Sequence, residues 1–500
     1  MKKPLLEIVV FVCGALVMVF ELVGARILGP YVGTSLFIWT SLIGIILGSL
    51  SVGYWLGGKL ADKRPNYSVF GSIILSAGLS ILFTAVVKDV LLQFLARNII
   101  DIRWLSIFAS LILFAPASVF LGMVSPYAIK LKLQSLRQSG RTVGNLYAIS
   151  TIGSIVGTFG AGFYLIPTIG TNKMVFVIAM TLMVISILTF LFNKKYIGVL
   201  ASIIFMIAAF ILFWIFSNRD TTLVDVDTLY NRVMIYETTD YKTGREIKLL
   251  KINDERSSAV FTDSDELVFY YLKYYHLAAH FNPQLKSALM IGGSAYTYPR
   301  DYLKKYPGAS IDVVEIDPKL TELSKVHFGL KEDPRLKIIH EDGRTFLNRG
   351  NGKYDVIFMD AFRSQFTVPF QLTTLECVEQ QYNLLTDGGL VIANVISALD
   401  GESNKFLQAQ AKTYEYIFPR VLYFAVGDPD DKNLFQNIMI VALKDSSMPV
   451  FTNPNPELDE YLSHHITLDI DGEIPVLTDD YAPVEYYAGQ TIAAYMRLFK

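Results

Sequence analysis

Small and acidic residues follow four short apolar stretches in the second half of the chain. They are Gly292-Gly293-Ser294 after the first stretch, Glu315 after the second, Asp342-Gly343 after the third and Asp360 after the fourth. Glycines let a nucleoside approach the backbone, and an acidic residue roughly 20 positions further on can accept hydrogen bonds from both ribose hydroxyls. The carboxylate of Asp342 can accept a hydrogen bond from an adenine amino group, and that of Asp360 can accept a proton from a reacting group. The pattern indicates a nucleoside site with a general base.

The elements that must position these residues are predicted to form a parallel sheet. Strands are expected at 287–293, 310–317, 336–343, 354–362 and 388–397, alternating with helices or loops, and further strands at 420–428 and 436–445. Ligands bind such sheets at the carboxyl ends of the strands. A single acidic residue there often only caps a helix or forms a turn, but four at successive strand ends favour a shared ligand site.

The first half of the chain predicts a membrane domain. The whole chain is 52% hydrophobic and only 18% charged, and the apolar excess is concentrated before residue 217. Runs long enough to cross a bilayer, at about 20 residues each, number seven. They lie near residues 5–28, 37–57, 68–87, 104–126, 143–168, 173–192 and 196–216. The first is predicted to be a retained helix, because Glu21 and Arg26 follow its apolar core and six more spans come after it.

The distribution of positive charge predicts the orientation of these spans. With the N-terminus in the cytoplasm, the inner segments carry eleven Lys and Arg residues and the outer segments six. The positive-inside rule therefore favours a multi-pass protein of the plasma membrane with its N-terminus inside, and an odd span count places residues 217–500 outside. The side of that domain stays open, because residues 88–103 are amphipathic and compatible with a segment lying in the interface. One miscounted span would reverse the result.

Other features limit the partners and ligands. A net charge of −2 provides no basic surface, so no nucleic-acid partner is expected. Two cysteines, Cys13 and Cys377, cannot build a disulfide framework or a metal site, and we expect no metal. Lipid and a small-molecule substrate are the expected partners, and self-association is left open. Residues 218–262 are predicted to form a separate β unit of about three strands, with a turn at 242–244.

The chain resembles the spermidine synthase (polyamine aminopropyltransferase) family, and more narrowly its members with a fused multi-span domain. The resemblance rests on "DVVEID", "HEDGRTFL", "YDVIFMDAF" and "LTDDYAPVEYY" in the second half, and on "ELVGARILGPYVGTS" and "GNLYAISTIGSIVGTFGAGFYLIPTIG" in the first. It implies a transmembrane α-helical domain at 1–217, the β unit at 218–262 and a Rossmann-like, spermidine-synthase-type α/β domain at 263–500. It also implies that S-adenosylmethionine or its decarboxylated form is a substrate.

By resemblance, Glu315 binds the ribose, Asp342 with Gly343 the adenine, and Asp360 is the catalytic aspartate. The sequence departs from the family where the transferred chain and its acceptor should lie. The family's GGGDGG turn is replaced by 292–297, "GGSAYT", which lacks the Asp that holds the donor's amino group, and a second family Asp is replaced by Arg363. Arg363 then either pairs with a substrate carboxylate or is a loop residue. Tyr270 corresponds to the acceptor-lining segment, with packing of an aromatic helix face as the alternative.

Two functions remain open on the sequence. One is a membrane-bound transferase that releases methylthioadenosine and uses an acceptor other than simple putrescine, or none if the donor reacts with its own carboxylate. Fewer carboxylates weaken the binding of a diamine, which is why putrescine is disfavoured. The alternative is a polyamine or nucleoside transporter or sensor whose second domain only binds the ligand. Glu21 and Arg26 are the ionisable groups of the first span that such a role would use.

Overall fold

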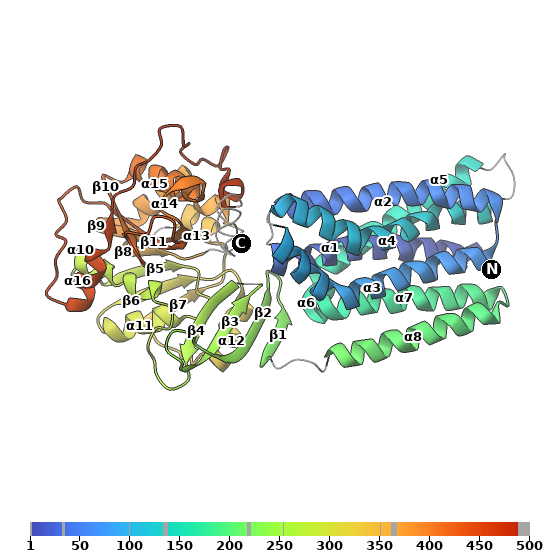
Figure 1. Cartoon of the computed structure of the whole chain (residues 1–500), viewed down its shortest axis with the longest axis horizontal. Helices are drawn as coiled ribbons and strands as arrows, with labels where there is room; N and C mark the ends of the chain where they lie inside the picture. Colours follow the sequence, from blue (N-terminus) through green and yellow to red (C-terminus); the bar gives the residue numbers. More distant parts are fainter. Residues whose placement is uncertain are drawn as a thin grey trace. The chain divides into compact units, whose positions relative to one another are not determined.

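The computed structural model describes residues 3–32, 36–99, 101–133, 139–217, 222–253, 255–350, 352–361 and 368–488. It contains two compact units (Figure 1). The first comprises Met1–Thr221 and Val226–Arg232, and the second comprises Thr222–Asp225 and Val233–Lys500.

The first unit is helical. Among the described residues, seven helices are long and apolar enough to cross a membrane, as the sequence predicts. The helices of this unit are α1 (Lys3–Val32), α2 (Leu36–Lys63), α3 (Tyr67–Asn98), α4 (Ile102–Lys132), α5 (Ser139–Gly160) with a π-helical continuation (Ala161–Leu165), α6 (Ile166–Ile169), α7 (Thr171–Phe192) and α8 (Tyr196–Ser217).

The described residues of the amphipathic segment 88–103 include the end of one helix and the start of the next. Residues 88–98 are the last turns of α3, because no Gly or Pro after Gly78 interrupts the helix. Lys88 is buried within the unit and its Nζ lies 2.7 Å from Oδ1 of Asp89. At the end of α1, Arg26 donates through Nη2 to the carbonyl oxygen of Leu229, at 2.6 Å.

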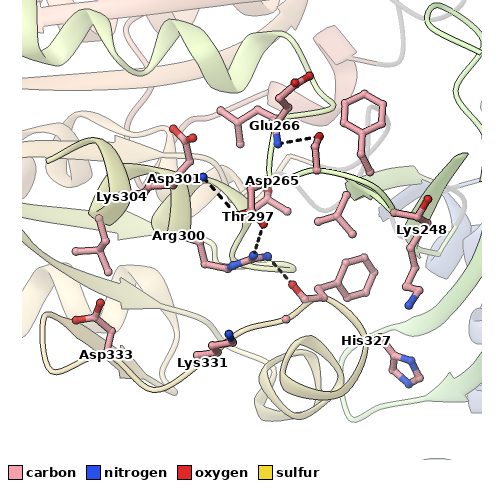
Figure 2. Close-up of a pocket in the computed structure, with 18 of the residues that line it drawn as sticks. Lys248, Asp265, Glu266, Thr297, Arg300, Asp301, Lys304, His327, Lys331 and Asp333 are labelled. Atoms are coloured by element: carbon pink, nitrogen blue, oxygen red, sulfur yellow. Dashed lines mark hydrogen bonds and ion pairs between the residues drawn. The ribbon is translucent and has the colours of Figure 1, made fainter. Parts of the chain in front are cut away.

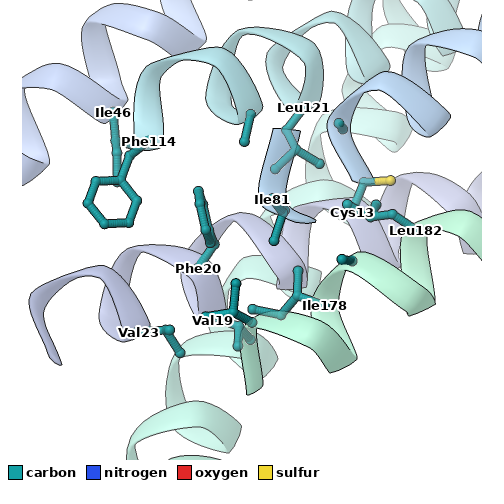
Figure 3. Close-up of a cluster of buried hydrophobic side chains, with 14 of the residues drawn as sticks. Cys13, Val19, Phe20, Val23, Ile46, Ile81, Phe114, Leu121, Ile178 and Leu182 are labelled. Atoms are coloured by element: carbon teal, nitrogen blue, oxygen red, sulfur yellow. The ribbon is translucent and has the colours of Figure 1, made fainter. Parts of the chain in front are cut away.

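Glycines bring pairs of helices into close contact. A Cβ at Gly157 in α5 would lie 2.3 Å from the carbonyl oxygen of Ala15 in α1, and one at Gly53 in α2 would lie 2.2 Å from that of Val119 in α4. Small residues spaced four apart permit this approach. Between the helices lies a buried apolar core, in which Phe20 and Phe114 meet edge to face with ring centroids 5.2 Å apart (Figure 3).

A four-stranded sheet in the order β1-β2-β3-β4 comes next along the chain, and most of its residues belong to the second unit. The strands are β1 (Val224–Asp227), β2 (Arg232–Thr239), β3 (Glu246–Ile252) and β4 (Glu255–Phe261). The turn expected at 242–244 is present, with Gly244 at φ +70°. The sequence indicated about three strands, because the short β1, "VDVD", alternates apolar with acidic residues and lacks a continuous apolar run.

The main sheet has eight strands in the order β12-β10-β11-β9-β8-β5-β6-β7. All seven strands expected from the sequence are present, and the two-residue β12 is an addition. The strands are β5 (Ser287–Ile291), β6 (Ser310–Val314), β7 (Leu336–Ile339), β8 (Tyr354–Met359), β9 (Leu385–Ser397), β10 (Arg420–Ala425), β11 (Gln436–Leu443) and β12 (His465–Ile466).

Strand direction places a crevice at the centre of this sheet. β5 is parallel to both β6 and β8. The strand order runs through β6 and β7 on one side of β5 and through β8 and β9 on the other. This is the switch point at which parallel sheets bind ligands. β11 continues the sheet as an antiparallel neighbour of β9, and β10 and β12 lie beyond it.

Helices cover both faces of the main sheet. In β5, Leu289 and Ile291 belong to one buried apolar cluster, whereas Ala288 and Met290 belong to another, as alternation in a strand requires. The second unit is therefore an α/β domain. Its helices are α9 (Tyr271–Tyr274), α10 (Leu277–Phe281), α11 (Thr297–Lys305), α12 (Pro318–His327), α13 (Gly343–Arg349), α14 (Leu375–Leu384), α15 (Lys405–Ile417) and α16 (Pro456–Ser463).

Candidate active site

The turn after β5 passes so close to the end of β8 that only glycine fits at its first position. Gly292 has φ +98°, and a Cβ there would lie 2.4 Å from the carbonyl oxygen of Asp360. Ser294 and Tyr296 also have positive φ, at +47° and +57°. Such backbone costs of order 1–3 kcal/mol per residue and persists only where its surroundings enforce it. The turn is therefore held in one shape by its neighbours.

Glu315, at the end of β6, is one of those neighbours. Its carboxylate is 6% exposed and accepts hydrogen bonds from the backbone N–H groups of Gly293 and Ser294, each at 3.0 Å, and of Asp317, at 2.9 Å. Burial raises the pKa of Glu315, and these donors oppose the rise. A carboxylate has about four acceptor positions, and three of them are already occupied here, two by the turn. The sequence did not reveal this structural role, which leaves limited capacity for ribose.

Asp342 lies at the end of β7 and caps helix α13. Its Oδ1 accepts from the backbone N–H of Thr345 at 3.0 Å. Gly343 follows at the first helical position, and a Cβ there would lie 2.7 Å from Cγ2 of Ile291, so α13 packs closely on the end of β5. The structure thus brings both residues beside the glycine turn, where the capping role of Asp342 is the contact that is formed.

Asp360, at the end of β8, is held by two side chains from other elements. Tyr271 donates its hydroxyl to Oδ2 at 3.0 Å, and Asn394 of β9 donates through Nδ2 to Oδ1 at 3.1 Å. Burial raises the pKa of Asp360 to about 6, and the two hydrogen bonds limit the rise. A carboxyl with this pKa is mostly ionised at neutral pH yet is a stronger base than an ordinary aspartate, which suits proton transfer.

A cavity of about 830 Å³ opens beside Asp360. It brings together several residues predicted from the sequence, namely Gly292, Gly293, Ser294, Asp360 and Tyr270. Glu315, Asp342 and Gly343 adjoin the glycine turn but are not among the described residues that line this space. The predicted contact Arg363 lies outside the described residues.

Tyrosines from the segment before β5 form one wall of the cavity. Tyr270 donates its hydroxyl to Oε1 of Glu460 at 3.0 Å, and burial together with Glu460 raises the pKa of Tyr270 to about 12. Tyr274 and Tyr275 are fully buried, so this segment packs on the sheet. Tyr271 nevertheless reaches Asp360, which sequence reasoning missed. Asn394 was missed as well, although it is a lone amide within the apolar run of β9.

The residues at the carboxyl ends of β5, β6, β7 and β8 do not line a second cavity, of about 1060 Å³ (Figure 2). Many of its charged side chains pair with one another. Arg300 and Lys304 both approach Asp265, each at 3.3 Å, and Arg335 pairs with Asp333 at 2.7 Å. The residues predicted to bind a nucleoside do not line this cavity, so the candidate site is the smaller one.

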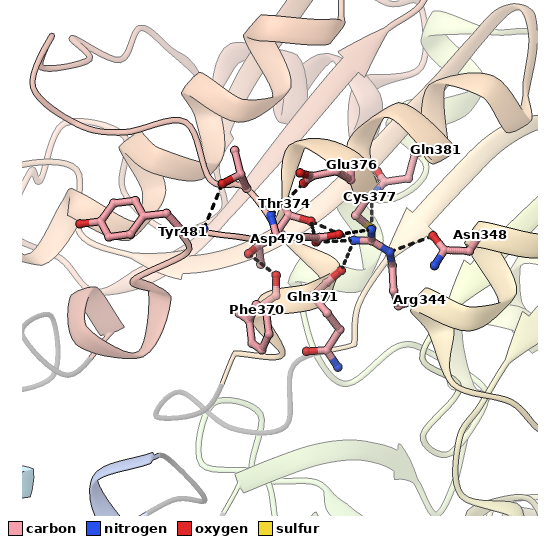
Figure 4. Close-up of polar contacts among 12 residues, drawn as sticks. Arg344, Asn348, Phe370, Gln371, Thr374, Glu376, Cys377, Gln381, Asp479 and Tyr481 are labelled. Carbon is pink, nitrogen blue, oxygen red and sulfur yellow. Dashed lines mark hydrogen bonds and ion pairs between the residues drawn. The ribbon is translucent and has the colours of Figure 1, made fainter.

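The "LTDDYAPVEYY" segment packs on α13 and α14 (Figure 4). Asp479 forms an ion pair with Arg344, with Nη2 and Oδ2 2.7 Å apart, and accepts from Oγ1 of Thr374, also at 2.7 Å. Arg344 further donates to the carbonyl oxygen of Gln371 at 2.8 Å. Arg344 follows Gly343 directly, so this contact fixes the start of α13, which Asp342 caps.

Comparisons with known proteins show which proteins the chain is similar to. Residues 268–451 match the family model of the spermine/spermidine synthase domain. A polyamine aminopropyltransferase of Vibrio vulnificus is 22% identical over 285 residues, which cover 53% of this chain and 91% of that protein. Polyamine aminopropyltransferase 2 of Aquifex aeolicus is 22% identical over 437 residues, covering 84% of this chain and 85% of that protein. The second similarity is long enough to extend into the helical unit.

A solved structure of a probable spermidine synthase from Corynebacterium glutamicum is 24% identical, with a TM-score of 0.38, and covers 45% of this chain and 81% of that one. The sheet, the glycine turn and the strand-end acids define a Rossmann-like α/β domain. More particularly, the C-terminal unit contains a spermine/spermidine synthase domain, and the N-terminal helices fit a fused domain. The resemblance found in the sequence is confirmed.

Proposed function

We propose that this protein is a membrane-bound transferase that uses S-adenosylmethionine or its decarboxylated form and releases methylthioadenosine. The observation that carries the proposal is Asp360, which is fixed by Tyr271 and Asn394 at the switch point of the sheet and faces the 830 Å³ cavity. The names of the homologous aminopropyltransferases support the same class of reaction.

The chemistry requires little more than positioning and one base. The nitrogen of an acceptor attacks the carbon beside the donor's sulfonium, the carbon–sulfur bond breaks, and methylthioadenosine leaves with the electron pair. The proton lost by the nitrogen passes to the carboxylate of Asp360. In an intramolecular variant, the donor's own carboxylate attacks its chain and no acceptor takes part.

The acceptor is proposed not to be simple putrescine. Ala295, which replaces the acid of the family's glycine turn, is fully buried and supplies no charge. Asp240 lines the cavity, but its Oδ2 accepts from the backbone N–H and hydroxyl of Thr243, at 2.9 and 2.8 Å, in its own turn. A diamine needs carboxylates for two ammonium groups, and this cavity offers few that are not already engaged.

The test is product analysis by mass spectrometry on the full-length, detergent-purified protein. Each donor, intact or decarboxylated, is supplied with and without putrescine, to the wild type and to Asp360→Asn. Asp387→Asn is the matched control, because Asp387 is an exposed residue of β9 that does not line the cavity. We expect methylthioadenosine from the wild type and the control, and a loss of at least a hundredfold in Asp360→Asn.

Different outcomes separate the parts of the proposal. Methylthioadenosine that forms only when putrescine is present would overturn the statement about the acceptor and leave the transferase in place. Formation that does not depend on Asp360 would remove the proposed base. If neither donor gives methylthioadenosine, the transferase proposal is wrong, and a transporter or sensor built on the helical unit is favoured.

A further inference from the structure

The cavity beside Asp360 also contains a positive charge that sequence reasoning missed. Arg256, in β4, lines the same space as Gly292, Ser294 and Asp360. Among the described residues, no carboxylate is in direct ion-pair contact with Arg256. The charge of Asp240, which lines the same cavity, interacts with it through space, and its guanidinium lies close to two aromatic rings. An arginine side chain in a ligand-sized cavity, with no carboxylate in direct contact, is suited to bind an anionic group.

An irregularity in β4 presents Arg256 to the cavity. Leu250 of β3 is opposite Ser258, but the next residue, Lys251, is opposite Arg256, so Ser257 has no partner. In a regular strand, Arg256 and Ser257 would point to opposite faces. A bulge changes this alternation and re-aims side chains. Both residues line the cavity, and the Ser257 hydroxyl lies 2.7 Å from that of Ser294 in the glycine turn.

Aromatic rings connect the guanidinium to the catalytic carboxylate. The Cζ of Arg256 lies 5.9 Å from the ring centroid of Tyr241 and 5.9 Å from that of Phe269. Phe269 stacks on Tyr271, with centroids 6.3 Å apart, and Tyr271 donates its hydroxyl to Asp360. One continuous wall of the cavity thus has a cation at one end and the proposed base at the other.

We infer that Arg256 binds a carboxylate, so that the cavity accepts a ligand with an amino-acid moiety. This rests on the proposed function and narrows its substrate class. The carboxylate has two possible sources, the donor in its intact form or an acceptor of the amino-acid type. The donor is the expected source, because Ser257, the neighbour of Arg256, contacts the glycine turn that the donor would approach. Guanidinium and carboxylate pair in a bidentate manner that lysine cannot reproduce.

The experiment compares ligands that differ only in this carboxylate, using the full-length protein in detergent. Intact and decarboxylated S-adenosylmethionine are titrated calorimetrically into the wild type, Arg256→Gln and Arg256→Lys. Turnover is then measured with ornithine and with its decarboxylated counterpart, putrescine. Lys248→Gln is the matched control, because it removes a positive charge from the neighbouring strand β3 at a residue that lines the other cavity.

We expect Arg256→Gln to weaken binding of the intact donor about tenfold or more and to change binding of the decarboxylated donor less than twofold. Arg256→Lys should fall between, and Lys248→Gln should match the wild type. If only turnover of ornithine depends on Arg256, the carboxylate belongs to the acceptor and the inference stands.

The inference would be overturned, and the transferase left intact, if Arg256→Gln changed binding of both donors equally and turnover of ornithine and putrescine equally. Absence of binding and turnover with both donors in the wild type would overturn the proposed function, and the inference with it. A melting temperature equal to that of the wild type confirms that Arg256→Gln is folded.

Discussion

The carboxyl of Asp360 can accept a proton only while it is ionised. Because burial raises its pKa to about 6, its ionised fraction falls as the pH is lowered through that value, and turnover should fall with it. The hydrogen bond from Tyr271 favours the ionised form. We therefore expect Tyr271→Phe to raise this pKa and to move the acidic limb of the kcat/KM profile upward by about one pH unit. The measurement is kcat/KM between pH 5 and 9.

Tyr423→Phe is the control for this profile. It also removes a tyrosine hydroxyl bound to a carboxylate, that of Glu415 at 2.7 Å, but neither residue lines the cavity. Its acidic limb should coincide with that of the wild type. If the activity of Tyr271→Phe drops equally at every pH, Tyr271 supports the site without changing the pKa of Asp360.

At the level of single residues, the sequence predicts candidate site residues but not their contacts. Gly292, Glu315 and Asp360 were found because each follows an apolar run, and strand ends are readable from one sequence. The hydrogen-bond partners of Asp360 were not found, because Tyr271 and Asn394 lie 89 and 34 residues from it along the chain. Spacing along the chain also does not show that the carboxylates of Glu315 and Asp342 accept hydrogen bonds from nearby backbone N–H groups.

At the level of elements, the ion pair between Arg344 and Asp479 joins the C-terminal segment to α13. The Arg344 side chain is 13% exposed and that of Asp479 is 46% exposed, so solvent screens the pair only in part. We expect Arg344→Met, which keeps the apolar stem, to cost about 1–2 kcal/mol locally and to speed hydrogen exchange in residues 474–482. Exchange detected by mass spectrometry is the measurement.

The exposed pair of Lys319 and Glu322 serves as the reference for that effect. Its side chains are 48% and 65% exposed, and Lys319→Met should change exchange in α12 by much less. Unaltered exchange at 474–482 in Arg344→Met would mean that the segment is held by its apolar contacts, through Leu477 and Val484, rather than by the ion pair.

Helix contacts in the first unit give a second prediction at this level. Gly157→Ala places a Cβ 2.3 Å from the carbonyl oxygen of Ala15, so α1 and α5 must move apart, at a cost of about 1–3 kcal/mol. Gly160→Ala in the same helix meets no atom within 4 Å and should be neutral or slightly stabilising through helix propensity. The measurement is the temperature at which half of the detergent-solubilised protein leaves the monodisperse peak. Equal values for both variants would contradict the contact.

The spacing of small residues along a helix accounts for these contacts only in part. The small residues at 53 and 57 and at 153 and 157 do face neighbouring helices, whereas Gly44 and Gly48, with the same spacing, meet no atom within 4 Å. The spacing shows that two residues share a face but not which helix covers that face. The seven spans themselves were predictable, because hydrophobic length is a property of the sequence alone.

At the level of the whole molecule, the odd number of candidate spans predicts the side of the second unit. With the N-terminus inside, as the positive charges favour, residues 217–500 lie outside. Buried Cys13 and Cys377 should not react with a membrane-impermeant maleimide, so single cysteines can be added to the natural chain. Met448→Cys, at a residue 76% exposed, should be labelled in intact cells, and Pro65→Cys, between α2 and α3, only after permeabilisation.

The opposite pattern would contradict the predicted orientation. It would also place the second unit in the compartment where S-adenosylmethionine is made, and the proposed reaction would need no transport step. The expected pattern has a stronger consequence for function. An external domain reaches its donor only if the donor crosses the membrane, so the helical unit would then be the first place to look for that passage, beginning with Glu21 in α1.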